Sequence, residues 1–363
     1  MSDERTQDFL VNRSDFREFR WDQLTDSKRA LEPGEARLRV DRYAFTANNI
    51  TYAVFGDALH YWDFFPAPAG WGRLPVWGHA DVVESRATAL AEGARVFGYL
   101  PMSPELLVRP ADVSERGFRD ASEHRSALPG TYQQYQITRR GNDEQEALRA
   151  LLAPLFGTAF LIDDWLDEHA RFGAKRVLLM SASSKTALGT AFMLSQRKDR
   201  AYEIVGLTSA RNRAFCESLG YYGRVLEYGA VRELDASTPT VSIDMAGDAS
   251  VLQAVHEHLG AALCHSCLVG ATHRVPPSAE STLPGPTPEF FFAPAQIQKR
   301  LSTWGPDGLG ARISAAQQAF FPSAKTWLAI VPVRGKAAIE SAYRTVLDGK
   351  ANPNEGLMLS ASK

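Results

Sequence analysis

The chain of 363 residues is poor in cysteine, in net charge and in long apolar runs. Its three cysteines cannot form a disulfide framework, which favours a cytoplasmic protein. Forty basic residues stand against 42 acidic ones without a strongly basic block, which argues against nucleic acid or a membrane surface as the main partner. No window approaches about 18 consecutive apolar residues, so we expect no transmembrane helix. The polar start, residues 1–9, does not resemble a secretory signal.

The first 140 residues predict a domain of short antiparallel strands. Residues 36–41 alternate between apolar and polar, which is typical of a half-buried strand. Further short runs bounded by turn residues predict strands at 80–85, 94–99 and 132–137.

The pattern changes near residue 144, where apolar residues recur at helical spacing up to residue 166, with a local break expected at Pro154. Strands then alternate with helices of about 10–15 residues, which predicts a parallel, doubly wound sheet. The expected strands are 176–181, 203–208, 241–245 and 261–269, and the expected helices are 186–196, 211–219 and 248–259. A helix at 335–347 and a strand at 356–359 are expected to return to the first domain.

The turn after the first parallel strand has the composition of a phosphate-binding turn. In doubly wound sheets this turn holds a phosphate. Ser181, Ser184 and Ala187 occupy the three small-residue positions of a G-x-G-x-x-G-type turn, and the following helix N-terminus would supply amide donors. Two alternatives stay open. Lys185-Thr186 follows a strand as in a G-x-x-x-x-G-K-[ST] loop, although both glycines are missing, and the small residues could serve packing alone.

The end of the second parallel strand predicts the type of dinucleotide. An acidic residue there would accept hydrogen bonds from an unphosphorylated ribose. The chain instead has Thr208, Ser209, Arg211 and Arg213, which suit a 2′-phosphate through charge-assisted hydrogen bonds. The alternative is that both arginines are solvated residues of a first helical turn.

This order of elements resembles the medium-chain dehydrogenase/reductase superfamily, nearest its zinc-free quinone-oxidoreductase-like branch. The resemblance implies an α/β fold: a Rossmann-type doubly wound parallel sheet at 151–309, and a GroES-like antiparallel β-barrel domain at 1–150 and 310–363. It also implies a homodimer formed edge to edge through the parallel sheet. The segments that carry it are GEARLRVDRYAFTANNITYAVFG (34–56), PVWGHADVVESRATALAEGARVFG (75–98), PLFGTA (154–159) and LDGKANPNEGLMLS (347–360).

By the same resemblance, NADP is the expected cofactor, and the candidate site residues follow residue by residue. Tyr52 falls at a pocket tyrosine and would hydrogen-bond or protonate a carbonyl oxygen. Thr158 and Gly270 would lie near the nicotinamide, and the end of the second strand would hold the adenosine phosphate. The pyrophosphate turn would comprise Ser181, Ser183, Ser184, Lys185 and Thr186.

We expect no metal. Zinc-dependent relatives use an early cysteine and a G-H-E motif, whereas this chain reads Gly78-His79-Ala80 and has no cysteine at 40–57. His79, our second candidate catalytic residue, is then either a pocket group that could pair with Asp81 or a core histidine. Cys264 and Cys267 are expected to be packing residues on opposite faces of a buried strand, and His256 and His258 to be surface residues.

Aromatic residues around the Pro/Gly-rich loop at 66–78, together with Phe290, Phe291 and Phe292, suggest an apolar pocket for an aromatic or aliphatic carbonyl substrate. The functional hypothesis is a zinc-independent, NADPH-dependent reductase of an enone, enoyl or quinone-like substrate. One alternative is a reductase-like scaffold with a degenerate cofactor site, acting as a binding protein or a non-redox enzyme. Another keeps the dinucleotide as a bound prosthetic group. The aromatic residues of the first cluster are Trp62, Phe64, Phe65, Trp71 and Trp77.

Overall fold

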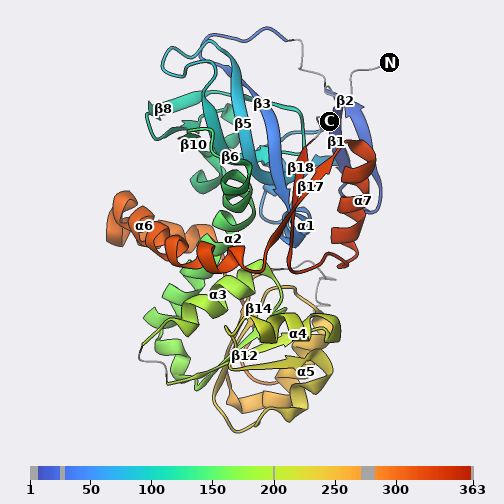
Figure 1. Ribbon diagram of the computed structural model, residues 1–363, viewed down its shortest axis with the longest axis vertical. Coiled ribbons are helices and arrows are strands. Elements are labelled where there is room, and N and C mark those ends of the chain that lie inside the picture. Colours follow the sequence, from blue (N-terminus) through green and yellow to red (C-terminus); the bar gives the residue numbers. More distant parts are fainter. Residues whose placement is uncertain (1–6, 25–28, 199–200, 271–282, 361–363) are drawn as a thin grey trace. The chain divides into compact units, whose positions relative to one another are not determined.

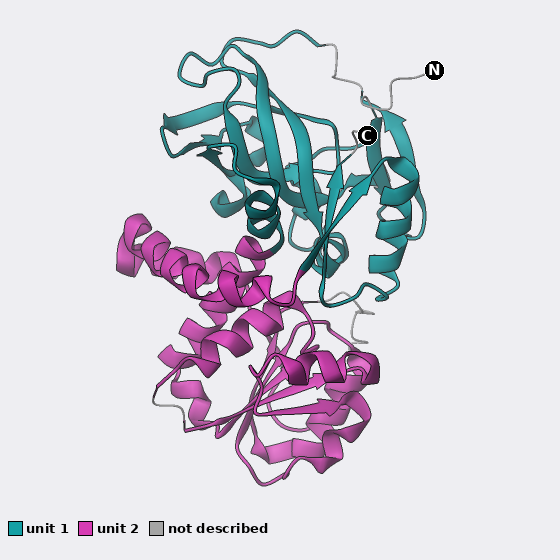
Figure 2. Ribbon diagram, in the orientation of Figure 1, with its two compact units in different colours: residues 1–151, 329–363 teal, residues 152–328 magenta. Residues whose placement is uncertain are grey.

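A computed structural model of the chain describes residues 7–24, 29–198, 201–270 and 283–360 (Figure 1). The chain divides into two compact units (Figure 2). Unit 1 comprises residues 1–151 and 329–363, and unit 2 comprises residues 152–328. Our expected domain boundaries were 150/151 and 309/310. The chain returns to unit 1 later than expected, at Ala329, because helix α6 (Ala293–Lys325) still belongs to unit 2.

Unit 1 is built on two sheets that are antiparallel except for one strand pair. The larger sheet has the order β17-β18-β3-β5-β6-β10-β9-β8, with β7 paired to β3, and only β17 and β18 run parallel. The smaller sheet has the order β2-β1-β4. The strands are β1 (Gln7–Asn12), β2 (Phe19–Gln23), β3 (Ala36–Phe45), β4 (Trp71–Arg73), β5 (Pro75–Ser85), β6 (Arg95–Pro101), β7 (Glu105–Val108), β8 (Pro110–Ser114), β9 (Gly117–Asp120), β10 (Gln134–Thr138), β17 (Ala329–Arg334) and β18 (Glu355–Ser360). The helices are α1 (Ala47–Val54) and α7 (Lys336–Leu347).

The packing of Trp62 in the core of unit 1 explains why two positions are glycine. Trp62 is 1% exposed and belongs to the main core. A Cβ on Gly56 would lie 2.0 Å from its indole ring, and a Cβ on Gly72 would lie 2.4 Å from it. Both positions therefore need glycine because the indole packs directly against the backbone.

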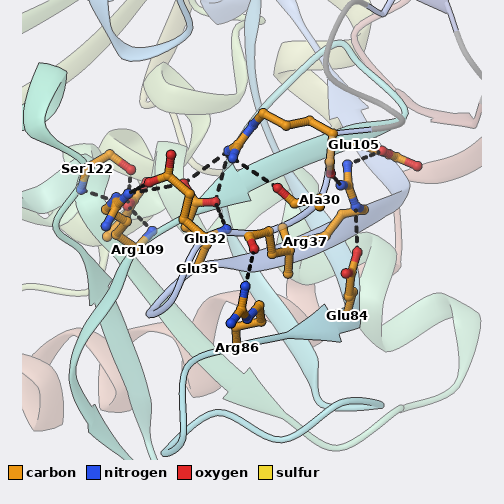
Figure 3. A network of polar contacts seen from close by, with 12 residues as sticks. Ala30, Glu32, Glu35, Arg37, Glu84, Arg86, Glu105, Arg109 and Ser122 are labelled. Atoms are coloured by element: carbon orange, nitrogen blue, oxygen red, sulfur yellow. Dashed lines mark hydrogen bonds and ion pairs between the residues drawn. The ribbon is translucent and has the colours of Figure 1, made fainter.

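A network of ion pairs holds the segment before β3 (Figure 3). Arg29 and Arg109 both contact Glu35, which is 6% exposed, and Arg37 pairs with Glu84 and Glu105. Burial alone would raise the pKa of Glu35, but the Glu32 amide and Arg29 hold that pKa below its usual range. The network therefore depends on keeping this buried carboxylate ionised.

Unit 2 contains a six-stranded parallel sheet with the order β13-β12-β11-β14-β15-β16. The chain steps outward from β11 in one direction and then restarts at β14 on the other side, so the order reverses between β11 and β14. This confirms the predicted doubly wound sheet. The strands are β11 (Arg176–Met180), β12 (Glu203–Thr208), β13 (Arg224–Glu227), β14 (Thr240–Asp244), β15 (Leu263–Leu268) and β16 (Glu289–Phe290), and further helices are α3 (Lys185–Ser195), α4 (Ala210–Ser218) and α5 (Ala249–Leu259).

Helix α2 (Asp143–Glu168) is continuous through Pro154, where we had expected a break. A proline removes one amide donor and normally kinks or ends a helix, yet α2 runs on past Pro154. The boundary between the two units falls three residues earlier in the same helix, between Leu151 and Leu152. By length and composition α2 could cross a membrane, yet most of its apolar window is buried within the protein. It also carries Asp163, which Arg197 pairs at 2.9 Å. We interpret α2 as a core helix.

Candidate cofactor and substrate sites

The turn between β11 and α3 lies at the point where the strand order of the sheet reverses. Ser181 has φ 60°, a left-handed conformation that costs a non-glycine residue on the order of 1 kcal/mol. The Ser184 amide donates to the Ser181 carbonyl at 2.9 Å, which closes the turn. The Ser184 hydroxyl then accepts from the Ala187 amide at 3.2 Å as the N-cap of α3. A serine-rich sequence thus forms a sharp strand-to-helix turn without glycine.

Two amides of this turn are available to a ligand. Within the described ranges, the amides of Ser183 and Thr186 donate no hydrogen bond to another residue. Both lie at the N-terminus of an 11-residue helix, where the helix dipole also favours an anion. The donor set therefore fits a phosphate group, and phosphate binding at this turn stays a prediction.

Neighbouring side chains hold the turn in place, and sequence reasoning missed three of them. The Ser183 hydroxyl, a predicted cofactor contact, accepts hydrogen bonds from Thr208 at 3.3 Å and from the Asn212 amide at 3.0 Å. Tyr222 donates its hydroxyl to the Ala182 carbonyl at 2.7 Å. The Tyr228 hydroxyl donates to Ser181 Oγ at 3.5 Å. Tyr228 directly follows β13, a four-residue strand that the sequence pattern did not reveal.

The residues predicted to bind the 2′-phosphate have different roles in the structure. Thr208 is 1% exposed and points to Ser183, so its hydroxyl supports the turn. Arg213 pairs with Glu217 at 2.9 Å and with Glu227 at 3.7 Å, which matches the alternative of a solvated helix residue. Arg211 is exposed in the first turn of α4, next to Ser209, the N-cap residue.

The two residues predicted near the nicotinamide have structural partners. The Thr158 hydroxyl donates to the Pro154 carbonyl at 3.4 Å, one turn earlier in α2. Gly270 follows β15, and a Cβ there would lie 2.0 Å from the Met245 carbonyl oxygen. Glycine is therefore required for the close approach of the chain after β15 to the chain after β14. Asp244 orders that second segment, because its carboxylate accepts the amides of Ala246 and Gly247, each at 2.9 Å.

In unit 1, helix α1 presents Tyr52. Thr46 caps α1 and forms a reciprocal capping box with Asn49. The Asn49 side-chain amide also donates to the Pro75 carbonyl at 2.8 Å, which ties α1 to β5. Tyr52 is 6% exposed, and its hydroxyl accepts a hydrogen bond from Trp77 Nε1 at 3.2 Å. The local sequence therefore fixes both the helix and the position of this phenol.

Tyr52 lies in a cluster of buried aromatic side chains, which we call the tyrosine cluster. The Tyr61 and Tyr132 hydroxyls are 3.3 Å apart, and ring centroids within the cluster lie as close as 4.7 Å, the Tyr52–Tyr61 separation. Burial raises the pKa of Tyr52, so it is a neutral phenol at neutral pH. The cluster consists of Tyr52, Tyr61, Phe64, Phe65, Tyr99 and Tyr132, with Trp77 packed against it.

The aromatic residues that we had grouped from the sequence separate in the structure. Trp62 belongs to the main core of unit 1, and Trp71 stacks under the Arg20 guanidinium, 4.1 Å from the ring centroid. In unit 2, Phe291 packs edge-on against Trp165, whereas Phe290 is 39% exposed. Sequence proximity within loops grouped rings that pack in different places.

His79 is a core histidine by its contacts. It is 1% exposed, and Nε2 lies 3.2 Å from the Glu146 carbonyl oxygen. A carbonyl only accepts, so Nε2 carries the proton; Nδ1 is buried without a partner among the described residues. Burial lowers the pKa of His79 from 6.5 to about 4. The pairing with Asp81 that we considered does not form, since Asp81 is bound by Arg95 and Arg140.

The remaining histidine and cysteine expectations are partly corrected. His256 is fully buried rather than on the surface: Nε2 lies 2.9 Å from Ser266 Oγ and Nδ1 lies 2.8 Å from the Pro284 carbonyl. The sequence missed this because both partners are distant in the chain. Cys264 and Cys267 are free thiols on β15, the first half-buried and the second buried. Among the described residues, no three His, Cys, Asp or Glu side chains gather as metal ligands would.

Comparison with family models assigns the chain to a family. Residues 43–352 match the model of the family described as "Protein of unknown function (DUF2855)". The chain belongs to this family. A search of curated protein sequences finds no match.

Solved structures identify the fold of this DUF2855 protein. CurA from Vibrio vulnificus in complex with NADPH is 12% identical, with a TM-score of 0.64 over 98% of this chain and 99% of that chain. YhdH from E. coli K-12 with bound NADPH is 14% identical, with a TM-score of 0.54 over 98% and 100%. A putative NADPH:quinone reductase from Mesorhizobium loti is 13% identical, with a TM-score of 0.56 over 94% and 90%. The chain therefore has the medium-chain dehydrogenase/reductase fold, as the sequence resemblance implied.

Proposed function

We propose that this DUF2855 protein is an NADPH-dependent oxidoreductase that works without zinc and reduces an enone, enoyl or quinone-like substrate. The observation that carries the proposal is the N-terminus of α3 at the reversal of strand order, with the amides of Ser183 and Thr186 open to a phosphate. The NADPH bound in the similar structures of CurA and YhdH supports the same cofactor.

The preference for NADPH over NADH is inferred from the end of β12. Residues 208–213 carry no carboxylate to accept hydrogen bonds from a ribose 2′-hydroxyl. Arg211, which is exposed in the first turn of α4, is our candidate ligand for the 2′-phosphate.

When bound, the reduced nicotinamide would supply a hydride to the substrate. The contribution of the chain would be to bind the cofactor phosphates through the β11–α3 turn and to polarise the substrate oxygen. Tyr52 suits the second task because its buried phenol stays protonated and can donate a hydrogen bond. The aromatic surroundings of Tyr52 favour an apolar substrate.

The proposal is tested by thermal unfolding with NADPH, with NADH and without ligand. A ligand that binds only the native state stabilises it by about 2.7 kcal/mol at 100 times its dissociation constant. We expect NADPH to raise the unfolding temperature more than NADH does. If millimolar NADPH produced no shift, the proposal would be wrong.

The second candidate function is a reductase-like scaffold that binds an apolar ligand without redox chemistry. The specific observation in its favour is the absence of glycine from the turn before Gly189, together with the strained Ser181. Binding of menadione to the protein without NADPH, combined with no NADPH-induced stabilisation, would support this candidate over the first.

We also propose a homodimer formed along β16, one of the two edge strands of the parallel sheet. Phe290 on this strand is the large hydrophobic side chain that is exposed within the described part of the chain. Sedimentation analysis of Phe290→Asp should show a monomer if the edge is the interface, and an unchanged dimer would exclude this edge.

A further inference from the structure

Trp77 makes a directional contact with the Tyr52 hydroxyl. Its indole Nε1–H can only donate, and it donates to Tyr52 Oη at 3.2 Å. The accepted hydrogen bond occupies one lone pair of the phenol, so the Tyr52 O–H must point away from Trp77. The indole thus excludes one direction in which Tyr52 could give its proton.

The indole of Trp77 is itself held by packing. Its ring stacks on Phe97 with centroids 5.8 Å apart and an interplanar angle of 29°, and it lies 5.3 Å from the Tyr99 ring. Trp77 is on β5, the strand to which Asn49 anchors α1. Donor and acceptor are therefore fixed on two elements that are tied together.

The same contact affects the charged form of Tyr52. Burial raises the pKa of Tyr52, while hydrogen bonds from Trp77, from Asn48 one helical turn earlier, and from Tyr132 lower it. A donor aimed at the phenol oxygen stabilises phenolate more than phenol, because hydrogen bonds to a charged acceptor are stronger.

We propose that Trp77 is a positioning residue for the reduction: its indole N–H aims the Tyr52 proton at the substrate oxygen and stabilises the phenolate left behind. This inference rests on the proposed function. It adds a residue that acts through Tyr52 rather than on the substrate.

In the proposed step, one proton passes from Tyr52 to the substrate. The Tyr52 O–H bond breaks, a new O–H bond forms on the substrate carbonyl oxygen, and the electron pair stays on Tyr52 Oη, where the indole N–H meets it. Bound NADPH would supply the hydride, and with it the two electrons and the second hydrogen, so that the substrate would be reduced and the nicotinamide oxidised. Water then gives a proton to the phenolate, and the hydroxide that is formed takes up a proton from bulk solvent.

The test compares Trp77→Phe, Tyr52→Phe and the double variant in NADPH oxidation with menadione and methyl vinyl ketone. Phenylalanine keeps an aromatic ring but removes the N–H. We expect Trp77→Phe to lower kcat by about 10- to 100-fold, the range for losing a hydrogen bond to a charged group, with KM and NADPH affinity unchanged. The double variant should lose no more than Tyr52→Phe alone, since the contact acts through Tyr52. Trp71→Phe, which changes an indole outside the tyrosine cluster, should leave kcat unchanged.

A second readout does not depend on turnover. In protein labelled with ¹⁵N-tryptophan, the indole signal that disappears in Trp77→Phe should shift in Tyr52→Phe. An unmoved signal, or fully additive losses in the double variant, would overturn the positioning role alone. No NADPH oxidation by the wild-type protein with either probe would instead overturn the proposed function, together with the role inferred from it.

Discussion

The β11–α3 turn of unit 2 and the tyrosine cluster of unit 1 are built from opposite kinds of residues. The turn uses small side chains, and its own hydroxyls fix the backbone, which leaves two amides open. The tyrosine cluster uses large rings, and its polar atoms are the ends of buried side chains. A site made from backbone amides tolerates serine where glycine is common, whereas a site made from side chains depends on each residue present.

The ion pairs beside the two regions also differ in their exposure to solvent. Beside the tyrosine cluster, Arg125 and Asp120 form an ion pair at 2.9 Å in which both side chains are essentially inaccessible to solvent. Beside the turn, the ion pairs of Arg213 are open to solvent. Breaking the buried Arg125–Asp120 pair should therefore act mainly on stability, whereas substitutions at the turn should act mainly on ligand binding.

The largest effect is expected for Arg125→Ala. Removing one partner of a buried ion pair typically costs about 3–5 kcal/mol, because the remaining charge is left uncompensated. Urea denaturation measures this loss directly. Arg119→Ala, on strand β9, is the matched control, since its pair with Asp112 is exposed and should contribute about 0–1 kcal/mol. Equal losses of unfolding free energy in Arg125→Ala and Arg119→Ala would contradict the difference between the buried and the exposed ion pair.

Next, Thr186→Glu should weaken NADPH binding by roughly 100-fold, because facing like charges cost several kcal/mol. The stability of the unbound protein should stay level or rise slightly, since an acidic residue favours a helix N-terminus. Isothermal titration and thermal unfolding separate the two effects. Gln196→Glu places the same charge at the other end of α3 and should leave NADPH affinity intact; a comparable loss there would refute a phosphate site at the turn.

A smaller effect is expected for Arg211→Ala, which should weaken NADPH binding by about tenfold through the loss of a charge-assisted hydrogen bond. Binding of NADH should not change. Arg213→Ala is the internal comparison: it removes only exposed ion pairs and should leave both affinities nearly unchanged. Equal losses for NADPH and NADH in Arg211→Ala would show that this residue does not read the 2′-phosphate.

The smallest effect is the pH dependence due to His79. Burial lowers the pKa of its folded state to about 4, below the ordinary 6.5, so the unfolded chain binds more protons between these values. The stabilisation is complete above pH 6.5 and declines as the pH falls, by about 1 kcal/mol by about pH 5.5. Glu146 does not contribute in this pH range. Burial raises the pKa of Glu146, but the hydrogen bond from Arg95 and its charge outweigh burial, so the stability that depends on the ionised Glu146 is lost only below pH 4.5. His79→Gln should flatten the upper part of the profile in urea denaturation; an unchanged slope would be inconsistent with a buried neutral imidazole.

How much the sequence could predict depended on the range of the interactions. The alternation of apolar strands and helices in unit 2 predicted the doubly wound sheet, because each buried strand is a local apolar run. The short strands β13 and β16 were missed, since four and two residues carry too little pattern. His256 was misplaced to the surface because its partners, Ser266 and Pro284, come from other elements.

The sequence by itself determined the doubly wound sheet, the small-residue turn and the lack of a carboxylate after β12, because these depend on residue type and on spacing within one element. Only the tertiary structure decided which candidates have partners. It paired Arg213 with two glutamates, buried His79 against a carbonyl, and brought the Trp77 indole on β5 to the phenol on α1. Such contacts join residues that are distant in the chain, and their energies depend on burial and direction, which no local pattern records.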